Sequence, residues 1–226
     1  GKRCDPVFNI AEGLHGLCRE AQIPALLDAY SIPYVFSDSF TLVVTLHKGV
    51  TKALVREHNV PTADYFLIQE LSDCDKVTLP YPLFLKPVGG GTGMGITSQS
   101  IVHNKEELIK IATTLLEEFK QGVLVETYLS GREFTVGITG TKDESTILGV
   151  MEIVVDPSFD NGIYSYTTKQ EYLKVATYHL VEGNIAAECE KVALDAWRAL
   201  GCRDGGRVDL KMDGAGRVNF LEVNPL

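Results

Sequence analysis

Two runs of alternating residues near the end of the chain constrain the fold most. Residues 205–210 and 220–225 both alternate β-branched or apolar residues with polar ones, a pattern typical of half-buried strands. Residues 213–216, Asp-Gly-Ala-Gly, lie between them and suit a tight connection. The sequence therefore predicts an antiparallel β-hairpin.

One face of this hairpin carries groups that suit a metal ion. Side chains two apart on a strand share a face, so Arg207 accompanies Asp209 and Glu222 accompanies Asn224. A tight hairpin brings Asp209 and Glu222 to direct or diagonal cross-strand distance. Hard oxygen ligands at such spacing favour Mg²⁺ carrying phosphates over zinc. A salt-bridged sheet face without metal is the alternative that the hairpin alone leaves open.

Composition excludes several classes of function. Of the 226 residues 45% are apolar, as in a globular protein with a sizeable core. No apolar run approaches the roughly 20 residues that a membrane-spanning helix needs. The net charge of −9 argues against nucleic acid or an anionic membrane as partner. The five cysteines form no CxxC pair, so we expect reduced thiols of a cytoplasmic protein.

The remaining patterns predict a mixed α+β arrangement without regular βαβ alternation. Helices are expected over residues 19–30, 48–58, 104–120 and 184–200, and strands over residues 7–10, 65–68, 83–87, 123–128, 133–139 and 147–155. Residues 156–182 form a long irregular stretch, which in a compact domain is usually functional or disordered. One strand pattern lies only a few residues after the start of the chain, and another ends just before its last residue. We therefore expect the chain to be truncated at both ends.

A glycine-rich segment, residues 88–95, follows a strand that ends near Lys86. Five glycines in seven residues let backbone N–H groups approach and cradle phosphate oxygens. The segment, called the glycine loop below, lacks the Lys-Ser/Thr of a P-loop, so a flap over nucleotide phosphates fits it better. A flexible hairpin tip is the alternative. Lys86 lies in an apolar strand, where an ammonium needs an anionic partner such as a phosphate.

Taken in order, these stretches resemble the D-alanine–D-alanine ligase family of the ATP-grasp superfamily. The matching motifs are residues 85–87 with the glycine loop, residues 125–136, residues 206–209 and residues 221–224. The resemblance implies an α+β ATP-grasp fold, two subdomains gripping ATP, preceded by part of an α/β domain. It divides the chain into a partial N-terminal substrate domain (1–38), a central ATP-grasp subdomain with the glycine loop (39–127) and a C-terminal subdomain with the metal site (128–226).

The same resemblance implies an ATP-dependent carboxylate–amine ligase of peptidoglycan biosynthesis. Such an enzyme forms a dipeptide from two molecules of D-alanine through an acyl phosphate, with ATP and Mg²⁺ (or Mn²⁺), and a homodimer is implied as well. Asp209, Glu222 and Asn224 would bind the metal ions. Arg207 would stabilise the oxyanion of the tetrahedral intermediate.

The resemblance also assigns residues to the substrates. The expected ATP contacts are Lys48, Lys86, Gly91, Thr92, Gly93 and Lys169 at the phosphates, Glu126 and Leu129 at the adenine, and Glu133 at the ribose. Thr92 and Lys169 would also take part in catalysis. His15 and Glu20 would contact the first substrate, with a solvated loop pair as the alternative.

Some residues depart from the family pattern. Where the family has a Ser-Ser pair, this chain has Thr92-Gly93, and where the family has a loop tyrosine, it has Gln170. Arg19-Glu20-Ala21-Gln22 replaces the family's Gly-Glu-Asp-Gly. All three lie among groups that would hold substrate, while those for ATP and metal are retained. Two alternatives therefore stay open: a ligase for another amino acid, hydroxy acid or peptide, and a nucleotide-binding module without ligase activity.

Overall fold

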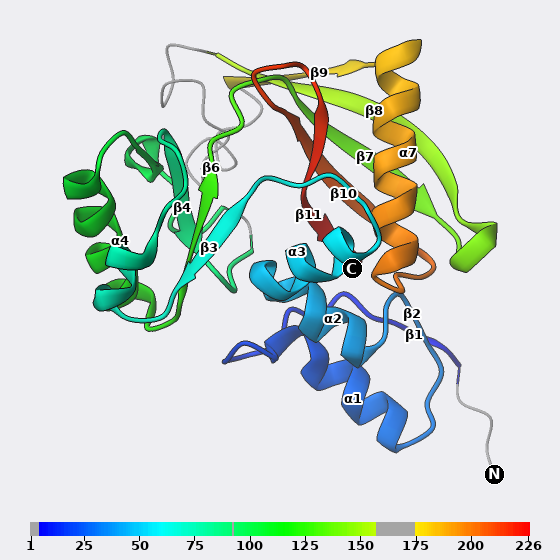
Figure 1. Cartoon of the computed structure of the whole chain (residues 1–226). Helices are drawn as coiled ribbons and strands as arrows, with labels where there is room; N and C mark the ends of the chain where they lie inside the picture. The colour runs from blue at the N-terminus through cyan, green and yellow to red at the C-terminus, as the bar shows by residue number, and fades with distance from the viewer. Residues whose placement is uncertain (1–4, 92, 157–174) are drawn as a thin grey trace.

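Two antiparallel sheets, each covered by a helix, make up most of the structure, which is a computed structural model (Figure 1). It describes residues 5–91, 93–156 and 175–226. In those residues the smaller sheet has the order β3 (Tyr65–Ile68), β6 (Val123–Thr127), β4 (Leu83–Pro87) and β5 (Ile101–Val102). The larger sheet has the order β11 (Val218–Asn224), β10 (Gly205–Met212), β7 (Glu133–Thr139), β8 (Thr146–Val155) and β9 (Ala176–Leu180).

Helix α4 (Lys105–Phe119) covers the smaller sheet (Figure 1). It begins at the N-cap Asn104, whose side chain accepts from the Glu107 N–H, while the Glu107 side chain accepts from the His103 N–H. Its buried side chains, Leu108, Ala112 and Leu115, share a core with Leu83, Leu85, Val123 and Val125 of the strands. The 3-10 helix Leu71–Lys76 contributes the buried Cys74 side chain to the same core.

Helix α7 (Asn184–Ala199) covers the larger sheet. Its fully buried Trp197 packs among strand side chains such as Phe134 and Phe220, and the indole N–H donates to the Gly140 carbonyl over 3.2 Å. Two further helices, α2 (Ser39–Leu46) and α3 (Lys48–Glu57), add Val44 and Val55 to this core. Helix α3 contacts α7, which covers the larger sheet, and strand β3 of the smaller sheet (Figure 1).

The N-terminal segment is a smaller unit below the two sheets in Figure 1. It contains the parallel pair β1 (Val7–Phe8) and β2 (Tyr34–Val35), a 3-10 turn (Arg19–Ala21) and helix α1 (Gln22–Ala29). The helix predicted over 19–30 is therefore confirmed in shorter form, although Ile23 and Leu26, whose helical spacing suits a buried face, are exposed. The strand predicted over 7–10 is only two residues long, and its Phe8 side chain is exposed.

The larger sheet has one strand that the sequence did not indicate. Residues 176–180 fall in the stretch predicted to be irregular, yet they form β9 at the edge of the sheet. The other predicted strands and long helices are confirmed within a few residues. Among the described residues, no helix combines the length and apolar character that crossing a membrane requires.

Candidate functional site

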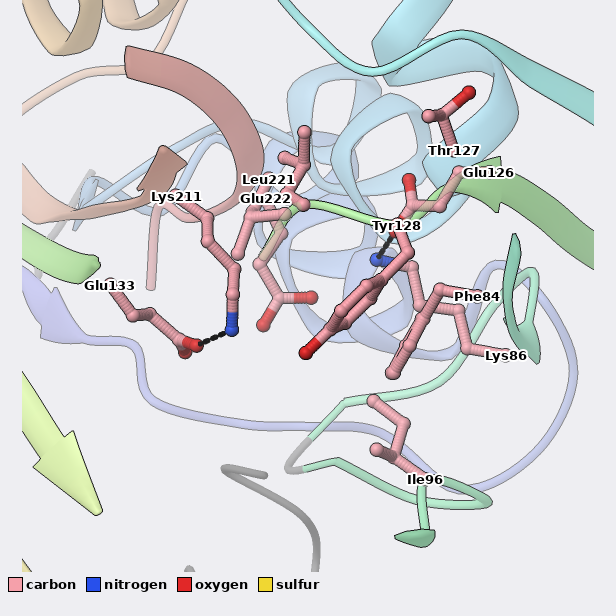
Figure 2. Close-up of a pocket in the computed structure, with 11 residues that line it drawn as sticks. Phe84, Lys86, Ile96, Glu126, Thr127, Tyr128, Glu133, Lys211, Leu221 and Glu222 are labelled. Carbon is pink, nitrogen blue, oxygen red and sulfur yellow. Dashed lines mark hydrogen bonds and ion pairs between the residues drawn. The ribbon is translucent and has the colours of Figure 1, made fainter. Parts of the chain in front are cut away.

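A cleft lies between the two sheets and is open at the glycine loop. Strands of both sheets and the segment that joins β6 to β7 form its walls. Figure 2 shows the side chains that line it. They are Phe84, Lys86, Ile96, Glu126, Thr127, Tyr128, Leu129, Glu133, Lys211, Leu221 and Glu222.

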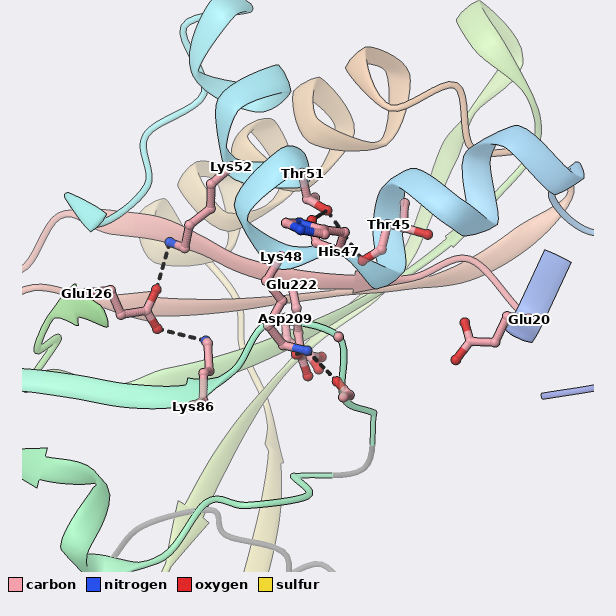
Figure 3. A network of polar contacts seen from close by, with 12 residues as sticks. Glu20, Thr45, His47, Lys48, Thr51, Lys52, Lys86, Glu126, Asp209 and Glu222 are labelled. Carbon is pink, nitrogen blue, oxygen red and sulfur yellow. Dashed lines mark hydrogen bonds and ion pairs between the residues drawn. The ribbon is translucent and has the colours of Figure 1, made fainter. Parts of the chain in front are cut away.

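A buried row of charges forms the floor of the cleft (Figure 3). The Glu126 carboxylate lies between two ammonium groups, 2.7 Å from Lys86 Nζ and 2.9 Å from Lys52 Nζ. All three side chains are almost fully buried. Burial alone would raise the pKa of Glu126, but the charges of Lys52 and Lys86 and their hydrogen bonds lower it to about 2. Glu126 is therefore ionised at any physiological pH.

The pKa values of the two lysines shift in opposite directions. Burial is the largest influence on both and by itself lowers the pKa of an ammonium group. For Lys52 burial prevails, and its pKa is lowered despite Glu126. For Lys86 the carboxylates of Glu126 and Glu222 together outweigh burial, and its pKa is raised. Lys86 is thus a stable cation at the edge of the cleft.

The far end of the cleft is apolar and aromatic. The Phe84 and Tyr128 rings stack with centroids 6.3 Å apart and planes inclined by 20°. Leu129 and Ile96 extend this surface, which suits a planar ring. Beyond it Lys211 Nζ contacts Glu133 Oε2 at 2.7 Å, so that Glu133 enters the cleft as half of an ion pair (Figure 2).

The hairpin contributes the opposite wall, and its predicted register is confirmed. Asp209 is directly opposite Glu222, and Arg207 is directly opposite Asn224. Thr135 Oγ1 donates to Asp209 Oδ1 over 2.7 Å, and Arg207 Nη2 lies 3.5 Å from Asp209 Oδ2.

Helix α3 also reaches this pair of carboxylates. Lys48 Nζ is 3.6 Å from Glu222 Oε2. The carboxylates of Asp209 and Glu222 therefore face a half-exposed arginine on one side and a buried lysine on the other.

The donor set of the hairpin fits a magnesium ion that carries phosphates. Within the described residues, no three His, Cys, Asp or Glu side chains gather closely enough to hold a metal by themselves. Two opposed carboxylates and the Asn224 amide nevertheless match the way Mg²⁺ is bound through one or two carboxylates, with phosphate oxygens and water filling the other positions. Asp209, Glu222 and Asn224 could hold the ion only together with such a ligand.

The glycine loop is tied to helix α3 and to the N-terminal segment. Lys48 Nζ donates to the Gly90 carbonyl, and Arg19 Nη1 donates to the Gly89 carbonyl over 3.4 Å. Gly95 has a φ of +74°, and a Cβ there would lie 2.7 Å from Pro87 Cγ, so this turn requires glycine. Gly91 and Gly93 belong to the same loop, whereas Thr92 lies outside the described residues.

The predicted first-substrate residues are only partly brought to the site. Glu20 is half-buried, bonded to Arg19 at 2.9 Å, and Figure 3 shows it apart from the group of Lys48, Asp209 and Glu222. Burial chiefly raises the pKa of Glu20, and Arg19 opposes that effect. His15 is exposed on the preceding loop. Lys169 and Gln170 lie outside the described residues.

Sequence reasoning missed Lys211, which lines the cleft, and Lys52, which is buried behind it. Lys52 follows Lys48 by one helical turn and so shares its face, which was the available signal, but lysines on helices usually face solvent. Lys211 follows Asp209 by two residues and shares the polar face of β10. Both lysines pair with glutamates that the sequence did single out, Glu126 and Glu133.

Two antiparallel sheets that enclose a lysine-lined cleft, with a glycine loop at its mouth, define an ATP-grasp fold. Solved structures agree: the structure of the VanG D-Ala:D-Ser ligase from Enterococcus faecalis superimposes with a TM-score of 0.74 at 23% identity, over 91% of this chain and 59% of that one. The family described as D-ala D-ala ligase C-terminus matches residues 54–226. This chain belongs to the D-alanine–D-alanine ligase family, as the sequence motifs predict.

Relatives in this family cover nearly the whole chain. The D-alanine–D-alanine ligase of Bordetella avium is 32% identical over 93% of this chain and 66% of its own length. That of Rhodospirillum rubrum is 30% identical over 98% of this chain and 69% of its own length. The chain thus spans about two thirds of the length of these curated relatives.

Proposed function

We propose that this protein is an ATP-dependent carboxylate–amine ligase that joins D-alanine to D-alanine. The observation that carries the proposal is that Lys86 and Glu222 line one cleft, with Asp209 directly opposite Glu222 on the hairpin. A cation and hard oxygen ligands at one site are what a magnesium–polyphosphate needs. Family membership supports the same assignment.

The cleft offers a place for each part of ATP. The adenine would lie against Phe84, Tyr128 and Leu129, and the ribose hydroxyls would donate to Glu133. The phosphates would extend past Lys86 towards Lys48, under the glycine loop, whose backbone N–H groups would bind phosphate oxygens. Glu126 contributes indirectly, because its carboxylate is already bonded by two lysines.

The reaction then has two steps. A carboxylate oxygen of the first D-alanine attacks the γ-phosphorus, ADP leaves, and an acyl phosphate forms. The amine of the second D-alanine attacks the acyl carbon, and phosphate leaves as the amine loses its proton. Lys48 and Lys86 would hold the phosphate charges in line, and Arg207 would stabilise the oxyanion that develops on the acyl carbon. Mg²⁺ or Mn²⁺ held by Asp209, Glu222 and Asn224 would supply further neutralisation of the phosphoryl oxygens.

A second candidate keeps this chemistry and changes one amino acid substrate. Arg19 stands where the family pattern has glycine, and its guanidinium lies between Glu20 and the Gly89 carbonyl. This ion pair changes the surroundings of Glu20, the predicted first-substrate residue, relative to the family pattern. Thr92, Gly93 and Gln170 depart from the pattern at the same substrate-holding positions.

Location and assembly follow from the proposed chemistry. A cytoplasmic setting would supply ATP and keep thiols reduced, and the described cysteines, Cys18, Cys74, Cys189 and Cys202, are all free. We also propose a homodimer on the family resemblance. Size-exclusion chromatography with light scattering would test it, and a monomer at micromolar concentration would contradict it.

The test of function is a product analysis. The purified protein is incubated with MgATP and a pool of D- and L-amino acids, and products are identified by mass spectrometry and chiral chromatography. D-alanyl-D-alanine with stoichiometric ADP is the expected result. A different dipeptide with ADP would favour the second candidate. ATP binding with neither ADP nor a condensed product would contradict both ligase assignments and leave a nucleotide-binding module.

A further inference from the structure

Helix α3 carries a lysine that reaches the cleft without lining it. Lys52 is fully buried, one turn after Lys48, and its ammonium group is 2.9 Å from Glu126 Oε2. It also donates to Thr62 Oγ1 over 2.6 Å, and that hydroxyl donates to the Phe220 carbonyl of β11 over 2.8 Å. Lys52 therefore connects the strand that bears Glu126 with the strand that bears Glu222.

The charges of this buried group do not balance. Two ammonium groups, Lys52 and Lys86, share the single carboxylate of Glu126, so the group of three has one positive charge in excess. A buried cation in excess is costly unless an anion compensates it. Two further carboxylates, those of Glu222 and Glu133, raise the pKa of Lys86. Each is already paired with another lysine, Glu222 with Lys48 and Glu133 with Lys211.

Removing Lys52 would change what Lys86 can do. Glu126 and Lys86 would then form a neutral pair at 2.7 Å, and a phosphate would have to compete with Glu126 for the ammonium group. With Lys52 present, Glu126 is held from its other side, and the excess charge stays with Lys86 at the edge of the cleft. An incoming polyphosphate completes the charge balance.

We propose that Lys52 is a positioning residue for nucleotide binding, which acts through Glu126 to leave Lys86 available to the phosphates. The inference rests on the proposed nucleotide function of the cleft. Lys52 itself would touch neither ATP nor the reacting atoms, because Glu126 and Thr62 occupy its ammonium group. The role belongs to the charge of Lys52 and not to the volume of its side chain.

The test measures MgATP and adenosine binding by calorimetry for the wild type and three variants. Lys52→Met should weaken MgATP binding by roughly tenfold or more, since a charged hydrogen bond of Lys86 becomes committed to Glu126. Adenosine, which has no phosphates, should bind unchanged. The double variant Lys52→Met/Glu126→Gln removes the competing carboxylate and should recover MgATP affinity to within about threefold of the wild type. Lys191→Met, which removes an exposed lysine of α7, serves as the control for net charge and should bind like the wild type.

The outcomes separate the inference from the proposed function. A wild type that binds neither MgATP nor adenosine contradicts the nucleotide site itself. A wild type that binds both, with Lys52→Met equally tight for MgATP, overturns only the role of Lys52. Three other results would likewise overturn that role: loss of adenosine binding in Lys52→Met, no recovery of MgATP affinity in the double variant, or an equal loss of MgATP affinity in Lys191→Met. Each would mean that Lys52→Met does not act through the charge of Lys86.

Discussion

Asp209 of β10 lies directly opposite Glu222 of β11, and the neighbouring strand β7 fixes the Asp209 carboxylate through the Thr135 hydroxyl. The two carboxylates therefore belong to a part of the sheet in which three strands are paired. A metal site made of strand residues varies less in geometry than one made of loop residues. The hydrogen bond from Thr135 leaves Asp209 Oδ2 on the side of Arg207.

Neutralising either carboxylate should abolish magnesium-dependent turnover. Asp209→Asn and Glu222→Gln keep size and hydrogen bonding but lose one negative charge, and a bound metal contributes several kcal/mol to the transition state, so we expect a loss of roughly a hundredfold or more. Steady-state ADP release at saturating ATP measures the effect. Asp195→Asn on the exposed face of α7 is the control. Retention of wild-type turnover by Glu222→Gln would contradict the metal assignment.

Replacing Glu126 by an apolar residue should destabilise the fold. Glu126→Leu leaves Lys52 and Lys86 buried without a counter-ion, and breaking a buried ion pair costs about 3–5 kcal/mol. Urea denaturation measures the free energy of unfolding. Glu117→Leu, on the exposed side of α4, should change it by about 0.5 kcal/mol or less. Equal effects of the two substitutions would show that the charges in the cleft floor are not coupled to stability.

The same ion pairs predict how stability depends on pH. The pKa of Glu126 is lowered from 4.5 to about 2, so between these values the unfolded chain takes up a proton that the folded protein does not. The free energy of unfolding should therefore be at its full value above pH 4.5 and fall as the pH drops towards 2. In this window the free energy of unfolding of the wild type should fall more steeply than that of Lys52→Met/Glu126→Gln, by up to about 1.4 kcal/mol per pH unit. Parallel pH profiles of the two proteins would contradict the lowered pKa.

Core packing of the larger sheet offers a test that does not depend on function. Phe134 is fully buried against α7, and Phe134→Ala should cost about 3–5 kcal/mol. Phe40 is 74% exposed on α2, and Phe40→Ala should cost about 0.5 kcal/mol or less. Fluorescence of Trp197, the single tryptophan, reports unfolding of this core in both variants. A large loss of stability in Phe40→Ala would mean that another surface covers α2.

The hairpin could be predicted because its information is local. Alternating residues fix which side chains share a face, and the short connection fixes which residues meet across the pair. The opposition of Asp209 and Glu222 followed from these two facts. A register shift after Asp209 did not follow, because nothing in the alternation marks it.

Lys52 could not be predicted because its burial depends on distant partners. Glu126 and Thr62, which surround its ammonium group, come from other elements. From the helix alone, a lysine one turn after another lysine is typical of a solvent-facing side. Strand β9 was missed for a different reason: it is a short edge strand with no fully buried side chain, and it follows a long stretch without strand or helix patterns.

The most direct test of the account follows oxygen from substrate to phosphate. The protein is given MgATP and D-alanine labelled with ¹⁸O in both carboxylate oxygens, and the released inorganic phosphate is analysed by mass spectrometry. An acyl phosphate requires that one ¹⁸O of the attacking carboxylate leaves with the phosphate, so we predict one labelled oxygen per phosphate and D-alanyl-D-alanine as product. Phosphate without label, released at the same rate with or without D-alanine, would contradict the ligase mechanism.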